Sequence, residues 1–182
     1  MKSALIVIDV QQSFLHRPYW RSDGASAFLN RIQQLIDRCQ AQDVPVLQVF
    51  HEEPVGVFSR TSGLVKSWDD LRITPTDVFF KDVHSALFGR NSSGVTLEAW
   101  LRFHGITRII VTGIRTEQCC ETTARHASDC GFEVTYALDA TLTFPMVAKS
   151  GRSYSAADIM ERTELVLQDR FAKVVSAEAV VV

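Results

Sequence analysis

The sequence has no apolar run long enough to cross a membrane. Its first such run, Ala4 to Ile8, is much shorter than a membrane-spanning helix or the hydrophobic region of a secretion signal. We therefore expect a cytoplasmic protein. Tracts of one charge sign are also missing, and the formal net charge at pH 7 is only −2. This balance gives no indication of nucleic acid or of a membrane as partner.

Cysteine is infrequent and lacks the spacing of metal or redox motifs. The chain has 182 residues and four cysteines: Cys39, Cys119, Cys120 and Cys130. No C-x-x-C pair occurs, which argues against a zinc knuckle and a thioredoxin-like site. A chain of this length with so few cysteines does not require a disulfide framework. We expect Cys39 and Cys130 to be small buried residues, and we expect no metal and no cofactor.

Apolar residues make up 46% of the chain, enough for one core, and we expect a single domain over residues 1–182. Strands are predicted at 4–10, 44–50, 77–81, 108–112, 133–138 and 171–175, and helices at 23–42, 96–104, 117–129 and 155–168. Strands that alternate with helices pair in parallel through right-handed crossovers. The prediction is therefore an α/β fold, a three-layer α/β/α Rossmann-like sandwich around a mainly parallel sheet of about six strands.

Polar side chains stand at the carboxyl ends of the predicted strands, where ligands bind in such sheets. These residues are Asp9, His51, Lys81 and Cys119. A carboxylate that follows apolar residues is costly to bury unless it is paired. Asp9 therefore either caps a nearby turn or acts as a base towards Cys119. Lys81 either pairs with Asp9 and favours a thiolate nearby, or lies at the surface.

Cys119 opens the predicted helix that follows the strand at 108–112. Because a helix N-terminus favours negative charge, we expect this placement to lower the pKa of the Cys119 thiol and to favour a nucleophilic thiolate. An aspartate, a lysine and a cysteine together can carry out nucleophilic acyl transfer. Backbone N–H groups of the turn at 114–119 are candidates for an oxyanion hole.

Three motifs carry a resemblance to a known family. They are I-V-I-D-V-Q-x-x-F at Ile6–Phe14, K-x-x-x-S-A at Lys81–Ala86 and G-I-x-T-x-x-C-x-x-x-T-A-R at Gly113–Arg125. With them the chain resembles the isochorismatase-like cysteine hydrolases, which include nicotinamidases and N-carbamoylsarcosine amidases. The resemblance implies a catalytic triad of Asp9, Lys81 and Cys119 and a cis peptide bond between Ile114 and Arg115. It further implies an oxyanion hole of the Arg115 and Cys119 backbone N–H groups, and a homo-oligomer.

The chain departs from the family pattern at the metal site of the nicotinamidases. Those enzymes carry Asp-x-His after the second strand, where this chain has F-H-E-E-P. His51, Glu53 and His84 are conceivable ligands, but we expect no metal and take His51 as a pocket residue. His126 replaces the aspartate of the family's T-A-R-D-A, and we expect it to make a structural hydrogen bond. Cys120 is expected to pack in the core.

Arg115 lies beside the implied cis bond, where its guanidinium could bind a substrate carboxylate or point outward to an acidic neighbour or a partner subunit. The other pocket candidates are Gln11, Phe14, His51 and Trp68. For Trp68, anchoring of a loop or a place in a subunit interface is the alternative. We expect the irregular stretch 51–75 and the loop 139–155 to form the pocket, and no pattern in them identifies the substrate.

The leading hypothesis is a cysteine hydrolase that cleaves a C–N bond of a small amide, ureido or carbamoyl substrate through a thioester. One alternative is an isochorismatase-type vinyl-ether hydrolase in which Asp9 is the acid. The other is a non-catalytic binding or redox-sensing module in which the adjacent Cys119 and Cys120 are oxidised. The sequence leaves open the substrate, the choice between these chemistries and the oligomeric state.

Overall fold

A six-stranded parallel sheet forms the middle layer of the protein, which a computed structural model describes over residues 2–182. Its strands are β1 (Ser3–Ile8), β2 (Val46–His51), β3 (Asp77–Lys81), β4 (Arg108–Ile114), β5 (Glu133–Leu142) and β8 (Lys173–Val175). They lie in the order β3-β2-β1-β4-β5-β8. Every neighbouring pair is parallel, as the alternation of strands and helices predicts.

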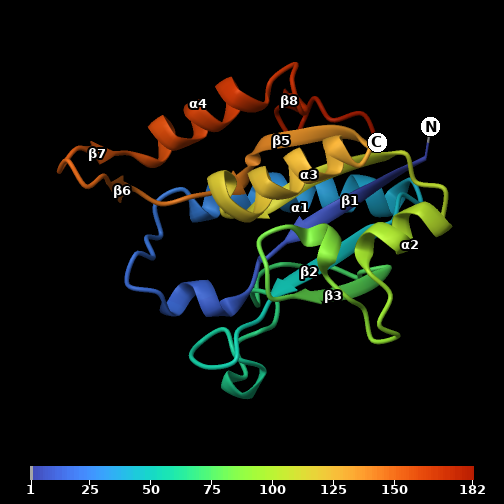
Figure 1. Cartoon of the computed structure of the whole chain (residues 1–182), viewed down its shortest axis with the longest axis horizontal. Coiled ribbons are helices and arrows are strands. Elements are labelled where there is room, and N and C mark those ends of the chain that lie inside the picture. The colour runs from blue at the N-terminus through green and yellow to red at the C-terminus, as the bar shows by residue number, and fades with distance from the viewer. Residues whose placement is uncertain (1) are drawn as a thin grey trace.

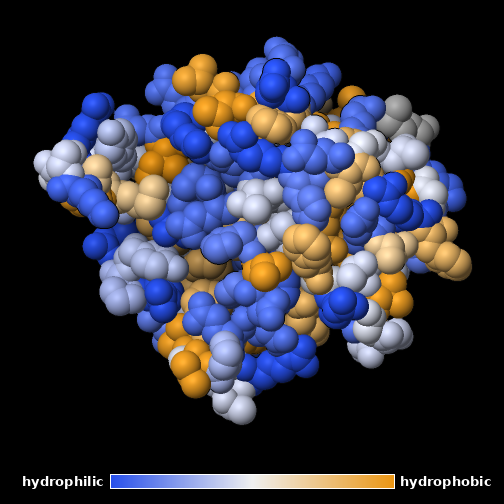
Figure 2. Space-filling view, viewed as in Figure 1, coloured by the Kyte–Doolittle hydropathy of each residue, from blue (hydrophilic) through white to orange (hydrophobic). Residues whose placement is uncertain are grey.

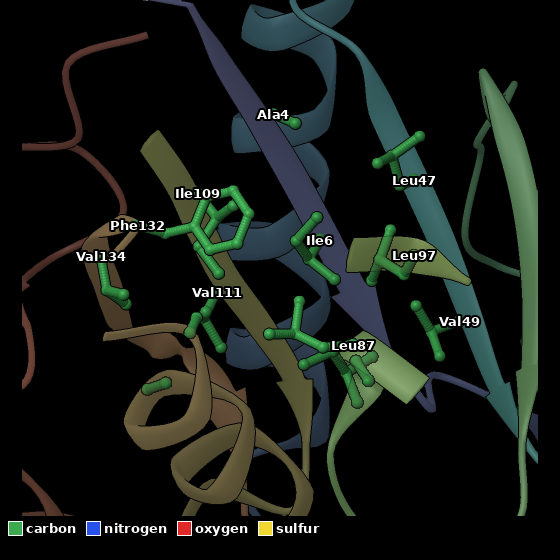
Figure 3. Close-up of a cluster of buried hydrophobic side chains, with 14 of the residues drawn as sticks. Ala4, Ile6, Leu47, Val49, Leu87, Leu97, Ile109, Val111, Phe132 and Val134 are labelled. Atoms are coloured by element: carbon green, nitrogen blue, oxygen red, sulfur yellow. The ribbon is translucent and has the colours of Figure 1, made fainter. Parts of the chain in front are cut away.

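Helices cover both faces of this sheet, which gives the predicted three-layer sandwich (Figure 1). On one face lies α1 (Ala25–Ala41), whose buried side chains join Leu5 and Val7 of β1. On the other face lie α2 (Leu97–Phe103), α3 (Glu121–Asp129) and α4 (Ala156–Leu167). Figure 3 shows part of the core on this second face, around Ile6. Because both faces of β1 are covered, its sequence is continuously apolar.

The central strands β1 and β4 approach each other closely near their carboxyl ends, where Ile8 pairs with Gly113. A Cβ atom added to Gly113 would lie 2.0 Å from the backbone oxygen of Ile8, and the φ of Gly113 is +125°. Only glycine fits this position. The close approach places the residue after β1, Asp9, beside the turn that leaves β4.

The helix predicted at 117–129 has a different beginning in the structure. Thr116–Cys120 form a π-helical turn (η4), and α3 starts only at Glu121. β5 runs four residues past the predicted end, to Leu142. β2 includes His51, one residue more than predicted, and the chain from there to residue 75 is irregular, as predicted, apart from a short 3-10 helix at Arg60–Ser62.

The chain after β5 forms a hairpin of β6 (Met146–Val147) and β7 (Ser153–Tyr154), which extends away from the sheet before α4 begins (Figure 1). Polar and apolar residues are mixed over the face that Figure 2 shows. Within residues 2–182, no helix has the length and apolar character needed to span a membrane.

Candidate active site

Asp9 immediately follows β1 and is completely buried. Its backbone has a φ of +54°, in the left-handed region that few residues other than glycine adopt and that aspartate tolerates better than most. The Asp9 N–H donates to the carbonyl of Val49 in β2 over 2.8 Å. This backbone conformation turns the chain sharply at the carboxyl end of the sheet, and it fixes the point from which the carboxylate projects.

Lys81, the last residue of β3, brings the predicted polar residues together. Its ammonium group is fully buried and lies 2.8 Å from Oδ2 of Asp9. It also contacts Sγ of Cys119 at 3.4 Å and Nδ1 of His51 at 3.3 Å. A lysine ammonium has three donors, so these three contacts use all of them. Side chains from four strand ends therefore meet at one point.

The two oxygens of the Asp9 carboxylate have different surroundings. Oδ2 accepts the hydrogen bond from Lys81. Oδ1 is buried and has no hydrogen-bond partner among residues 2–182. A buried carboxylate oxygen without a donor is unusual, and it keeps its capacity to accept a proton.

The prediction that the pKa of Cys119 is lowered is wrong for this resting site. Burial of the thiol raises its pKa above the ordinary value, and the negative charge of Asp9 raises it further. The charge of Lys81 acts in the opposite direction but does not outweigh them. Cys119 also lies in the π-helical turn, before α3 begins. The resting group is therefore a protonated thiol, which needs a base before it can attack.

Lys81 is held in its charged form at the same site. Burial alone would lower the pKa of Lys81, but the negative charge of Asp9 and the hydrogen bonds to Asp9 and Cys119 outweigh this effect and raise it. A cation is thus fixed beside the sulfur.

The turn that carries Cys119 begins at a cis peptide bond and is closed by hydrogen bonds to the Arg115 carbonyl. The peptide bond between Ile114 and Arg115 is cis, at the position that the sequence motif implies. The Arg115 carbonyl accepts hydrogen bonds from the N–H groups of Gln118 and Cys120, both at 3.2 Å. Cys120 itself is completely buried and packs in the core, as predicted.

Arg115 has an acidic neighbour, Glu117, rather than solvent. Nη2 of Arg115 lies 3.0 Å from Oε1 of Glu117, and both side chains are buried. The rings of Tyr19 and Phe144 lie beside the guanidinium, with their centroids 4.9 and 5.6 Å from Cζ of Arg115. The guanidinium therefore sits between aromatic rings and is balanced by a carboxylate.

Gln11 and His51 hold the ends of β1 and β2 together. Nε2 of Gln11 donates to the His51 carbonyl over 2.9 Å, and the His51 N–H donates to Oε1 of Gln11 over 2.8 Å. The amide side chain of Gln11, a predicted pocket residue, thus binds the backbone of His51 through both its N–H and its oxygen. Burial lowers the pKa of His51, and the charge of Lys81 lowers it further, so the imidazole is neutral near pH 7.

Phe14 and Trp68 belong to aromatic contacts beside these hydrogen bonds. Phe14 packs edge-on against Phe58 with centroids 5.1 Å apart, and Phe58 in turn packs against His51. The indole N–H of Trp68 donates to the Gln11 carbonyl over 2.9 Å, and its ring is buried against Trp20. For Trp68, these contacts favour the alternative interpretation, in which it anchors the irregular loop.

The residues at the end of β2 do not match a metal site of the nicotinamidase type. No group of three His, Cys, Asp or Glu side chains among the described residues could hold a metal ion. Nδ1 of His51 faces the Lys81 ammonium, while its Nε2 lies 3.6 Å from Glu53. A cation beside one nitrogen of the imidazole leaves that nitrogen unsuitable as a ligand.

Sequence reasoning missed the role of Thr123. Its hydroxyl donates to the carbonyl of Cys119 over 2.6 Å and accepts the Ala86 N–H over 2.9 Å. The four-residue spacing from Cys119 to Thr123 places both on one helix face and was the available signal. The expected structural hydrogen bond of His126 is present, between its Nδ1 and the Ser85 hydroxyl at 2.8 Å.

Comparisons with known proteins agree with this geometry. The family model of the isochorismatase domain matches residues 3–179. The isochorismatase family protein YrdC of Bacillus subtilis is 27% identical over an alignment of 188 residues. The alignment covers 99% of this chain and 95% of YrdC. Nicotinamidase 3 of Arabidopsis thaliana is 30% identical over 158 residues, which cover 78% of this chain and 74% of that protein.

Solved structures show the same architecture. A crystal structure of a protein of the isochorismatase family from Chromobacterium violaceum superposes on this chain with a TM-score of 0.85 and 26% sequence identity. The alignment covers 97% of this chain and 90% of that one.

Proposed function

This chain belongs to the isochorismatase family and is a hydrolase, and on that premise we propose that it cleaves a C–N bond in a small amide, ureido or carbamoyl compound. One observation carries the proposal. The Lys81 ammonium, buried beside Cys119, simultaneously contacts a carboxylate and the thiol. This arrangement provides a base, a cation and a nucleophile for acyl transfer.

The first half of the reaction forms a thioester. Oδ1 of Asp9 takes the proton of the Cys119 thiol, and the sulfur attacks the substrate carbonyl carbon. The Lys81 ammonium stabilises the developing thiolate. The backbone N–H groups of Arg115 and Cys119 donate to the oxyanion of the tetrahedral intermediate. When this intermediate collapses, the C–N bond breaks and Asp9 returns the proton to the leaving amine.

The second half of the reaction restores the enzyme. Asp9, again ionised, accepts a proton from a water molecule, whose oxygen attacks the thioester carbonyl. The C–S bond breaks, the carboxylic or carbamic acid leaves, and the sulfur regains a proton. One carboxylate therefore acts as base and acid in alternation, which its unoccupied oxygen allows.

Two other chemistries fit the site less well. A vinyl-ether hydrolase would need Asp9 as an acid but gives Cys119 no task, although the thiol is placed against Lys81. A redox-sensing pair would need reactive thiolates, whereas burial raises the pKa of both Cys119 and Cys120. An Arabidopsis relative named as a nicotinamidase also favours amide chemistry.

Replacement of the nucleophile tests the proposal. A panel of small amides, ureides and N-carbamoyl compounds is assayed for release of ammonia or amine, with pyruvate measured for vinyl ethers. We expect Cys119→Ala to lower hydrolysis by about a thousandfold or more. Intact mass spectrometry of the wild type should detect the acyl adduct on Cys119.

The matched control is Cys130→Ser, which removes a thiol outside the site and should leave turnover unchanged. If Cys119→Ala kept hydrolysis of a C–N substrate, the thioester mechanism would be wrong. Pyruvate release that persisted in the same variant would establish the vinyl-ether chemistry instead.

A further inference from the structure

Arg115 and Glu117 form a buried ion pair in the same turn as Cys119. Their side chains are only 8% and 9% exposed, and the charged atoms lie 3.0 Å apart. The proposed mechanism uses the backbone of Arg115 but neither of these two side chains. Two charged groups buried without a catalytic task call for another explanation.

The position of the pair is at the carboxyl edge of the sheet, where the proposed reaction takes place. Tyr19 and Phe144, whose rings lie beside the Arg115 guanidinium, come from the segments after β1 and β5. Asp9 and Cys119 come from the segments after β1 and β4. The Arg115 side chain also starts from the residue whose N–H is the proposed oxyanion donor.

The pair keeps unused hydrogen-bonding capacity. Among residues 2–182, Nε of Arg115 has no hydrogen-bond partner, and Nη2 of Arg115 and Oε1 of Glu117 contact each other at 3.0 Å without hydrogen-bond geometry. The other Glu117 oxygen accepts from the Thr143 hydroxyl over 2.6 Å. Donors on one side and an acceptor on the other match a neutral group that has both a carbonyl and an N–H, such as a carboxamide or a urea.

The buried charges of the site cancel in pairs. Lys81 balances Asp9, and Arg115 balances Glu117. A substrate with a carboxylate would therefore add a buried charge that nothing compensates. Arg17, which packs on the Tyr19 ring, is exposed, so solvent and salt screen its charge.

We propose that the Arg115–Glu117 pair selects an uncharged substrate and binds an amide or ureide group of it. Arg115 donates to the carbonyl oxygen of that group and Glu117 accepts from its N–H. The inference rests on the proposed function and narrows its substrate class. Of the interpretations that the sequence leaves open for Arg115, the structure favours the acidic neighbour over a substrate carboxylate, because Glu117 already balances that cation.

Two alkylating agents of nearly the same size test the charge preference without any turnover. Iodoacetamide is neutral and iodoacetate is anionic, and tandem mass spectrometry separates modification of Cys119 from that of Cys120. The ratio of their rate constants at Cys119 is compared with the ratio for the free thiol of glutathione, at high salt to screen Arg17. We expect the wild type to disfavour iodoacetate by about tenfold or more relative to glutathione.

Charge variants then give an ordered series. Glu117→Gln leaves Arg115 uncompensated and should raise the relative rate of iodoacetate about tenfold. Arg115→Gln should lower the relative rate of iodoacetate. In the double variant the pair is neutral again, so this relative rate should return towards the wild-type value. Glu98→Gln breaks an exposed Arg–Glu pair on α2 as the matched control and should change nothing.

A wild-type ratio equal to that of glutathione would overturn the inference. So would a series in which Glu117→Gln and Arg115→Gln both leave the ratio within about twofold of the wild type while Cys119 still reacts with iodoacetamide. Alkylation does not require hydrolysis. If the charge series holds but no C–N substrate is cleaved, the proposed function fails while the charge selectivity of the pocket stands.

Discussion

At the scale of single residues, the site depends on how one carboxylate is shared. Asp9 gives one oxygen to Lys81 and leaves the other without a partner. The same carboxylate raises the pKa of the neighbouring thiol through its charge. Burial and the charge of Asp9 together keep Cys119 protonated at rest, and in the proposed mechanism the same carboxylate removes that proton.

Asp9→Asn separates these two effects. Loss of the negative charge leaves Lys81 uncompensated beside the sulfur, so the pKa of Cys119 should fall and alkylation by iodoacetamide near pH 7 should become faster. Hydrolysis should fall about 10²- to 10⁴-fold, because the base is lost. Stopped assays of both rates on one preparation would check this. Slower alkylation together with lost hydrolysis would instead indicate a misplaced Cys119.

At the scale of secondary-structure elements, the segment after β3 is tied to α3 by two hydrogen-bonded links. One joins the Ser85 hydroxyl to His126, and the other runs from the Ala86 N–H through Thr123 to the Cys119 carbonyl. These links connect the strand that ends in Lys81 to the turn that carries Cys119. These links therefore help to hold the Lys81 ammonium 3.4 Å from Sγ of Cys119.

Thr123 is the residue through which this link can be tested. Thr123→Val keeps the shape but leaves the buried Ala86 N–H without an acceptor, and we expect it to lower the free energy of unfolding by about 1–3 kcal/mol. Thr123→Ser retains the hydroxyl and should preserve more of the alkylation rate of Cys119. Urea unfolding and iodoacetamide kinetics measure the two effects. Equal alkylation rates in both variants would show that the hydroxyl does not position the thiol.

At the scale of the whole molecule, buried thiols make stability sensitive to alkaline pH. Burial raises the pKa of Cys39 to about 12, and it raises those of Cys119 and Cys120 as well. The folded protein therefore holds these protons above pH 9.0, the ordinary thiol value, where the unfolded chain has lost them. Stability is fully present below that pH and decreases as the pH rises towards the folded-state pKa values.

Above pH 9, each such thiol lowers the free energy of unfolding by about 1.4 kcal/mol per pH unit, so three thiols lower it by about 4 kcal/mol per unit. Cys39→Ala should remove about a third of this slope, since one of the three groups is gone. Urea unfolding under reducing conditions between pH 8 and pH 10.5 measures it. Ile32→Val, in the same core cluster, is the control, because it should lower stability equally at every pH. An unchanged slope in Cys39→Ala would contradict the assignment.

Much of the fold is encoded locally. Continuous apolar strands and periodic helices alternate along the chain, and this pattern alone predicts a parallel sheet between two helical layers. The same reasoning predicts that Asp9, Lys81 and Cys119 lie at strand ends on one edge. Their meeting follows from topology, because the carboxyl ends of parallel strands lie on one side of the sheet.

What the tertiary structure decided is the state of these groups. Cys119 lies 38 residues from Lys81, and Asp9 lies 72 residues from it, so no local pattern reports their distances or burial. Desolvation and the charge of Asp9 determine the sign of the thiol pKa shift, which a helix N-terminus alone predicts wrongly. Which acidic group balances Arg115 likewise depends on the path of one buried turn. The sequence by itself determined which chemical groups come to this edge of the sheet, and only the packing around them decided which of them are protonated, paired or free.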